Sequence, residues 1–431
     1  MNLRATWSLS ITTCVATLVA ASGVTRAEAP TPVVPWTIDD VARMALERRP
    51  EIAAAQARTR AAEQRPAIVG ALEDPMLMPS VEFPFMFDGV SAGLIFEQEF
   101  PLSSVLSRRA DGARAQARGA ALQGEIVALD AALEATNAFH MLWGRRENRR
   151  ILEAQIGLAR QLVASTAARY GAGAGSQSQV LRAEAELARL EAGRRSLARS
   201  VMAGEAMLAA SVGEEVTTAI PELTAPDPEA LAADIQLGPG GPGGDDTTIV
   251  AGQPEVQVGD EEIRRWTAEV GAMRSMYAPM ARLQTGPVYS TDMGAGWMVM
   301  FGVSLPIWRG KLDAGVDEAR AMVAMAKADR DAMRRMVAAG IAEARQLVAG
   351  AHERYQALVA DVLPRVRAAV DSALAGYGSG RDPQVSVIEA LQTLWSVERE
   401  TVMARMELGL TRARLDRALG RWRVGVPKDK P

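Results

Sequence analysis

The chain has a single cysteine, few aromatic residues and little net charge. The one cysteine among 431 residues is Cys14, which excludes a disulfide framework and any zinc site built on cysteine ligands. Aromatic residues make up only 5% of the chain, and long stretches lack glycine and proline, a composition that favours long helices over a large mixed core. The formal net charge is −4 and no basic block stands out, so a nucleic-acid-binding protein is not expected.

Residues 1–27 have the pattern of an export signal. Arg4 supplies a positive start, Leu9 to Ala21 form an apolar stretch, and small residues precede a cleavage point after Ala27. Cys14 lies inside the apolar stretch rather than after it, so it is not expected to carry a lipid. No other apolar run reaches the roughly 18 residues that a membrane-spanning helix needs. The exported chain could therefore enter a membrane only through β-strands.

A strand followed by a proline and a very long helical pattern occurs twice. Residues 286–320 show it clearly, and residues 89–114 repeat it, with Pro101 and Pro306 coinciding after a shift of 205 positions. Further along, the Tyr-Gly-x-Gly segments at Tyr170 and Tyr377 coincide after a shift of 207. Two nearly equal shifts over this length indicate an internal duplication.

The strand pattern alternates between an apolar and a polar side. In the first copy Val90, Ala92, Leu94 and Phe96 share one side, whereas Ser91, Gly93, Glu97 and Glu99 share the other. About ten residues of such alternation is typical of a transmembrane β-strand, with Glu97 and Glu99 facing the lumen. We expect β-hairpins over about 75–100 and about 284–305, and we expect Pro101 and Pro306 to mark the junction between barrel and helices.

Each strand pair is followed by a long helical hairpin. The first is predicted over about 103–211 and the second over about 311–420, each turning at a glycine-rich tip, and the first helix alone would be about 100 Å long. The whole chain then divides as follows: signal peptide 1–27, first repeat 28–212, Pro/Gly-rich linker 213–252, second repeat 253–420 and tail 421–431. The predicted fold class is mixed and mainly α.

The duplicated strand–proline–helix unit, the Arg-Pro-Glu and Gln-Pro-Glu helix starts at Arg49 and Gln253, and the Tyr-Gly-x-Gly tips resemble the TolC family of outer-membrane efflux channels. The resemblance implies a homotrimer with a twelve-stranded barrel in outer-membrane lipid and a helical barrel in the periplasm. It also implies a periplasmic adaptor and an inner-membrane pump as partners, and passive conduction of metal cations or drugs. Four strands alone cannot close a barrel, whereas three copies supply twelve.

The helix tips are the predicted periplasmic aperture. In the family an acidic residue often precedes the Val-Leu of the return helix, but the matching positions here are Gln179 and Ser386. The nearest acid is Asp382, beside Arg381, and we hypothesise that Asp382 lines the closed entrance. The alternative is an acid that only stabilises a helix start. The other predicted aperture residues belong to the two turns: Tyr170, Gly173, Tyr377 and Gly380.

Other chemistry has little support. The only histidines, His140 and His352, lack partners at metal-binding spacing, so neither a metal site nor a cofactor is predicted, and no nucleophile–base set indicates an enzyme. Methionines in or near the strands (Met76, Met78, Met293, Met298 and Met300) have thioethers that suit Cu(I), but apolar packing explains them more simply. A periplasmic adaptor or scaffold without a barrel is the competing functional class.

Overall fold

The computed structural model describes residues 35–82, 90–232 and 246–423. The predicted signal peptide, the Asp88-Gly89 turn and the glycine-rich stretch that starts at Gly238 lie outside these ranges. The elements in chain order are α1 (Ile38–Arg48), α2 (Pro50–Gly70), β1 (Met76–Glu82), β2 (Ser91–Pro101), α3 (Val105–Gly171), α4 (Gln177–Ser211), α5 (Pro228–Ala232), α6 (Asp246–Gly252), α7 (Pro254–Ser275), β3 (Met280–Ser290), β4 (Gly294–Ser304), α8 (Arg309–Gln356), the π-helix η1 (Ala357–Val362), α9 (Leu363–Gly378) and α10 (Gln384–Ala418).

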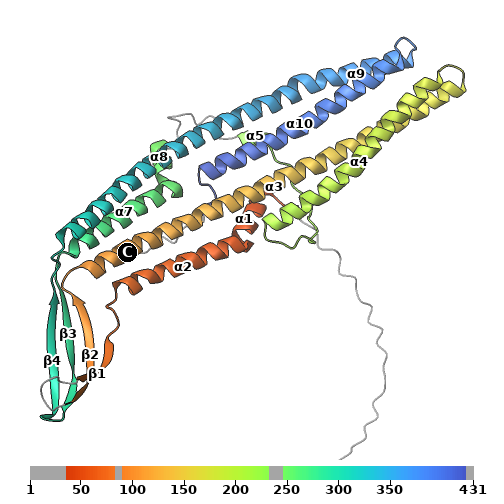
Figure 1. The fold of residues 1–431 in the computed structure, drawn as a ribbon. Helices are drawn as coiled ribbons and strands as arrows, with labels where there is room; N and C mark the ends of the chain where they lie inside the picture. Colours follow the sequence, from red (N-terminus) through yellow and green to blue (C-terminus); the bar gives the residue numbers. More distant parts are fainter. Residues whose placement is uncertain (1–34, 83–89, 233–245, 424–431) are drawn as a thin grey trace, which may run out of the picture.

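The molecule is elongated, with all four strands at one end and both helix tips at the other (Figure 1). The long helices α3 and α8 run away from the sheet, and α4 and α10 return from the tips. α2 and α7 lie alongside the half of the bundle nearest the sheet. This arrangement confirms the predicted fold class of long helical hairpins with four β-strands.

The four strands form one antiparallel sheet in the order β1-β2-β3-β4. The two repeats meet in its centre, where β2 of the first repeat pairs with β3 of the second. β3 begins at Met280, four residues before the predicted start at about 284, because β2 continues to Pro101 and offers Met280 a partner. The outer edges of β1 and β4 have no partner strand within the described chain.

The two long helices differ at the level where the 207-residue shift pairs Gly157 with Pro364. α3 continues for 67 residues and passes Gly157 without a break. The helix that starts as α8 changes into the π-helix η1 and resumes as α9, whose second residue is Pro364. Proline lacks an N–H and its ring clashes with the preceding turn, whereas glycine keeps its hydrogen bond, so only the proline disrupts the helix.

The segment predicted as a linker, residues 213–252, contains two short helices, α5 and α6. α5 is anchored because Leu231 is buried and its carbonyl accepts a hydrogen bond from Arg412 Nη1 at 3.0 Å. Trp36 and Leu223 form an isolated parallel bridge nearby. The described part of the predicted linker thus contains helices, because contacts with distant helices supply the stabilisation that the local composition lacks.

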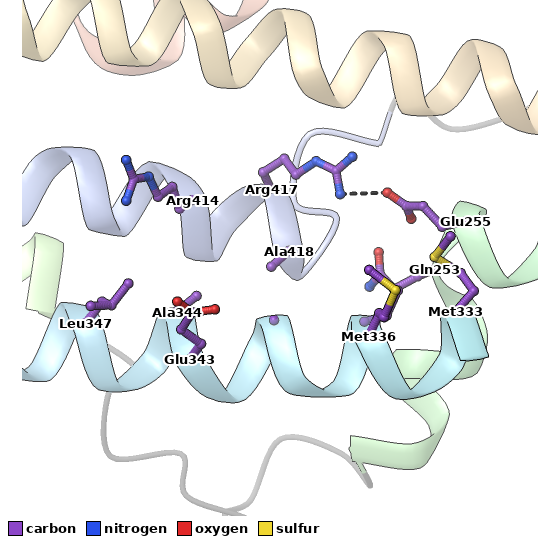
Figure 2. Close-up of a pocket in the computed structure, with 12 residues that line it drawn as sticks. Gln253, Glu255, Met333, Met336, Glu343, Ala344, Leu347, Arg414, Arg417 and Ala418 are labelled. Atoms are coloured by element: carbon purple, nitrogen blue, oxygen red, sulfur yellow. Dashed lines mark ion pairs between the residues drawn. The ribbon is translucent and has the colours of Figure 1, made fainter. Parts of the chain in front are cut away.

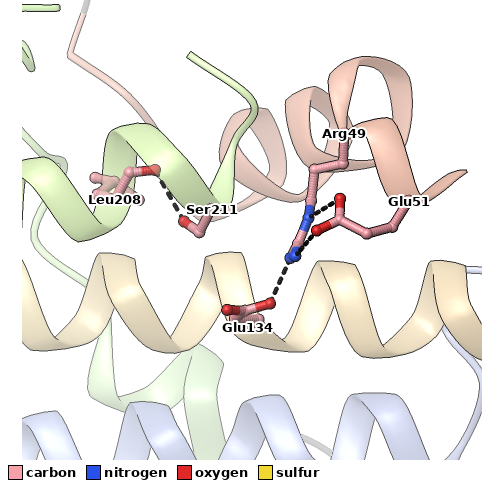
Figure 3. Close-up of polar contacts among 5 residues, drawn as sticks. All are labelled: Arg49, Glu51, Glu134, Leu208 and Ser211. Carbon is pink, nitrogen blue, oxygen red and sulfur yellow. Dashed lines mark hydrogen bonds and ion pairs between the residues drawn. The ribbon is translucent and has the colours of Figure 1, made fainter. Parts of the chain in front are cut away.

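The two repeats start their second helices in the same way. α2 and α7 each begin with a proline in the first turn, preceded by Arg49 and Gln253 in extended conformation. Figure 3 shows that the Arg49 guanidinium lies between Glu51, 3.1 Å away, and Glu134 of α3, 2.5 Å away. In the same region Ser211 Oγ donates to Leu208 O at 2.8 Å, at the end of α4. The Arg49 ion pairs therefore fix the α1–α2 junction against α3.

The bundle core is built from aliphatic side chains and alanine. One cluster of buried residues joins α1, α3 and α4, and it includes Val41, Phe139, Leu142 and Leu208. A second cluster near the tips joins α3, α4, α9 and α10, including Ile156, Leu190, Val370 and Trp395. Among the described residues, no helix has an eighteen-residue window that is apolar enough to cross a membrane.

His140 occupies the close crossing of α3 and α10. Its ring is 1% exposed and packs edge-on against Phe139 at a centroid distance of 5.5 Å. A methyl group on Gly409 of α10 would overlap the His140 ring. The absence of a side chain at Gly409 therefore allows the two helices to approach here.

We expect Gly409→Ala to destabilise the protein by about 1–3 kcal/mol, since the added methyl forces apart two packed helices. The free energy of unfolding in guanidinium, measured on the detergent-solubilised protein, checks this. The matched control is Gly350→Ala in α8, where nothing lies within 4 Å of the added methyl. Equal stability of the two variants would contradict the account of this crossing.

Burial lowers the pKa of His140 from 6.5 to about 4. The unfolded chain therefore takes up a proton at this ring near pH 6.5, whereas the folded chain does so only near pH 4. The free energy of unfolding should fall as the pH drops from about 6.5 through about 4, by about 1.4 kcal/mol per pH unit from this group. His140→Leu should flatten that part of the stability profile, and an unchanged slope would exclude His140 as its source.

Candidate functional site

The sheet has one polar face, and its centre is an ion-pair network. Arg282 of β3 lies opposite Glu99 of β2 and pairs with it, and its guanidinium lies 3.1 Å from Glu97. Gln284 Nε2 donates to Glu97 Oε2 at 2.6 Å. Glu97 and Glu99 thus share a face, as predicted, but they are neutralised in part by Arg282, whose position across the strands the sequence did not reveal.

The opposite face of the sheet is apolar, and no other part of the described chain covers it. On β4, Trp297, Phe301 and Val303 are 66%, 78% and 59% exposed, and on β1 Leu77 is 63% exposed. The register places these residues on the same face as Phe96 of β2. A continuous apolar surface of this kind on an exposed sheet indicates contact with lipid or with another protein.

The predicted junction residues lie where the sheet meets the helices. Pro101 ends β2 and pairs with Met280 of β3. Pro306 follows β4 by two residues and lies in the short connection that leads into α8. Trp308 and Ile307 in this connection are 76% and 66% exposed.

Both helix tips turn by the same mechanism. Gly173 and Gly380 adopt positive φ values of 73° and 76°. The amide that follows each glycine donates back to a helical carbonyl, Ala174 N to Arg169 O at 2.8 Å and Arg381 N to Gly376 O at 2.9 Å. This is the Schellman helix ending, for which glycine is favoured because other residues are strained at positive φ.

Side-chain interactions connect the two tips. The Arg169 guanidinium lies 4.6 Å from the centre of the Tyr377 ring, and its Nη1 donates to Tyr377 O at 3.3 Å. Gln384, which is buried, donates from Nε2 to Gln179 O at 3.2 Å. These two interactions join the hairpins within one chain.

The remaining predicted tip residues are at the surface or in local turns. Asp382 and Arg381 are exposed, and the Asp382 carboxylate lies against Gly376, where an added methyl group would overlap it. Arg381 Nε donates to Ser379 Oγ at 3.0 Å. Tyr170 is half exposed, Ser386 lies in the first turn of α10, and Gln179 Oε1 accepts from Ser176 N at 3.1 Å.

Arg169, Gln384 and Arg282 are site residues that the sequence reasoning missed. Each acts on a partner far along the chain, at sequence separations of 208, 205 and 183. The 207-residue shift was a usable signal for Arg169, because it pairs this residue with Gly376 and so shows a difference between the tips. It pairs Gln384 with the identical Gln177 and gives no such signal there.

A cavity of about 440 Å³ lies between α8, α10 and the start of α7 (Figure 2). Arg417 and Glu255, 2.6 Å apart, form one end of it, and Met333 and Met336 lie on the α8 side. No group of three or more His, Cys, Asp or Glu side chains that could hold a metal occurs in the described residues. We therefore assign no ligand to this cavity.

Comparison with known proteins identifies the architecture. Residues 251–421 match the family model of the outer membrane efflux protein. No curated protein matches the chain in sequence. Among solved structures, the outer-membrane channel OprN is 19% identical, with 90% of each chain covered and a TM-score of 0.76. CusC is 14% identical over 89% of this chain and 91% of that one, with a TM-score of 0.77. VceC from Vibrio cholerae is 16% identical over 89% and 96%, with a TM-score of 0.73.

We expect Arg169→Ala to loosen the contact between the two tips. The variant loses a cation–π contact and one hydrogen bond, together about 1–2 kcal/mol. Hydrogen exchange of amides near Tyr377 should become faster, while exchange near the sheet stays the same. Arg182→Ala, which removes an exposed arginine near the start of α4, is the control. Equal exchange in both variants would show that Arg169 does not hold the tips together.

Proposed function

Because residues 251–421 form an outer membrane efflux protein domain in a chain with the fold of outer-membrane efflux channels, we propose that the protein is the outer-membrane exit duct of a tripartite efflux system. The observation that carries this function is the sorting of the sheet into two faces. One face is exposed and apolar, and the other holds Glu97, Glu99, Arg282 and Gln284. An apolar exterior and a polar interior are what a strand needs between lipid and a water-filled lumen.

The duct is a homotrimer. A sheet with open edges leaves backbone N–H and C=O groups unsatisfied in lipid, at a cost of several kcal/mol for each group. Within the described chain β1 and β4 are such edges. Three chains joined β4 to β1 supply twelve strands and leave no edge, and the helices continue the tube on the periplasmic side.

The proposed partners follow from the location of the helix tips in the periplasm. A periplasmic adaptor and an inner-membrane pump deliver the substrate to the helix tips, and the duct conducts it to the exterior without chemical change. Metal cations and drugs are the substrate classes, and the sequence from Met300 to Ala319 is most similar to the metal-cation efflux subgroup. Neither an enzymatic activity nor a cofactor is part of the proposal.

The entrance of the duct is at the tips, where Asp382 is the proposed lining residue. Its exposure at the end of the molecule farthest from the sheet supports this role. Threefold repetition would place three carboxylates around one axis. Such a ring attracts cations, as rings of acidic side chains do in cation channels.

Purified protein inserted into a planar bilayer should give single-channel conductance, and Asp382→Ala should weaken block by divalent cations several-fold, because a ring of three charges is lost. Asp371→Ala, an exposed acid on α9 outside the turn, should leave the block unchanged. Identical conductance and block in wild type and Asp382→Ala would reject Asp382 as a lining residue.

Fractionation separates the duct from the alternative, a periplasmic adaptor or scaffold. The duct should be recovered from the outer membrane as a trimer that needs detergent, because its apolar sheet face contacts lipid. Recovery as a soluble periplasmic protein would reject the duct in favour of the scaffold. Deletion of the protein followed by growth tests on metals, dyes and antibiotics identifies the substrate class.

A further inference from the structure

The methionines of the strands are sorted to one side of the sheet. Cross-strand partners share a face, and the register pairs Met76 with Glu97 and Met300 with Gln284, both on the polar face. The same face holds the remaining strand methionines, Met78, Met280 and Met298. In the described strands all five methionines therefore lie on the polar face, and the apolar face has none.

Apolar packing does not explain this sorting. A methionine that only supplied apolar contact would fit equally well among Leu77, Phe96 and Phe301 on the face that meets lipid. On the polar face Met76, Met300 and Met280 are 58%, 52% and 41% exposed, so they are not packed into a core within the chain. Their thioether groups are available to a solute on this face.

Four of these methionines form two pairs with one residue between them. Met76 and Met78 are on β1, and Met298 and Met300 are on β4. Residues two apart in a strand lie about 7 Å apart on the same face, and methionine has three rotatable side-chain bonds. Both sulfur atoms of one pair can therefore reach a single ion.

The charges on the same face favour a cation. Glu82, Glu97 and Glu99 face Arg282 alone, so the polar face of the described strands has an excess of carboxylates. Glu97 lies directly across from Met76. Thioethers are soft ligands that select monovalent copper, and the chemically similar silver ion, over zinc, magnesium or calcium.

We propose that the Met76–Met78 and Met298–Met300 pairs bind soft monovalent cations, Cu(I) or Ag(I), along the wall of the lumen. The proposal rests on the proposed function, in which the polar face lines the duct. β1 and β4 are the two edge strands, so closure of the barrel places β4 of one chain beside β1 of the next. Each chain then contributes two thioether pairs to the wall of the lumen, where a soft cation is held on its way out.

Silver nitrate is the probe, since Ag(I) needs no reductant and nitrate does not precipitate it. Equilibrium dialysis of the detergent-solubilised protein should show silver bound to the wild type. A variant with Met76, Met78, Met298 and Met300 all changed to Leu should lose most of it, because leucine keeps the apolar volume but has no sulfur. The control Met202→Leu/Met207→Leu changes two methionines of α4 that are each 59% exposed, and it should bind as the wild type does. Silver binding that is equal in all three proteins overturns the proposal.

Bilayer recordings in potassium nitrate distinguish a failure of the methionine site from a failure of the proposed duct. Micromolar silver should block the wild type and the α4 control but not the fourfold variant, and Zn²⁺ should not distinguish them. Normal potassium conductance with the same silver block in the fourfold variant would contradict the methionine site and leave the duct standing. Absence of conductance in every protein would contradict the duct, while the dialysis result would still decide whether these methionines bind silver.

Discussion

The unpaired edges of β1 and β4 are the constraint on which the rest of the structure depends. A sheet of four strands with one apolar face is not a complete unit in water or in lipid, because backbone groups at both edges and the side chains of one face lack partners among the described residues. In the proposed trimer, repetition of the chain around an axis satisfies all of them at once. The same closure turns the polar face inward, and it brings the helices that leave each strand into a tube.

The duplication gives the chain two helix tips, and the residues that differ between them explain their different interactions. Both tips end in the same glycine turn, with positive φ at Gly173 and Gly380. The copies differ at several positions, and at two of them Arg169 and Gly175 of the first tip correspond to Gly376 and Asp382 of the second. Arg169 reaches across to Tyr377, whereas Gly376 leaves room for the carboxylate of Asp382. Arg169 thus gives the first tip its contact to the second, and Asp382, where the first copy has Gly175, gives the second tip its exposed acid.

Much of the fold was predictable from the sequence, because its main signals are local and repeated. Alternation and proline placement indicated the strands and their two faces, and the resemblance to outer-membrane efflux channels is confirmed by the matches in family and fold. Interactions between distant segments were not predictable. Nothing near Leu231 in the sequence indicates that Arg412 anchors α5, and the partner of Glu99 required the β2–β3 register. The methionine sorting was visible on β4 alone, but only pairing across four strands shows that it is general.

Cross-linking of the two sheet edges tests trimeric closure most directly. Leu77→Cys on β1 is combined in turn with Trp297→Cys, Val299→Cys or Phe301→Cys on β4, in a chain whose only other cysteine is Cys14. Within one chain these edges are separated by two further strands, about 14 Å, which is too far for a disulfide, so a bond forms only between chains. The account predicts that at least one combination gives a disulfide-linked ladder that ends at three chains. Monomers in every combination, or a ladder that continues past three, would contradict it.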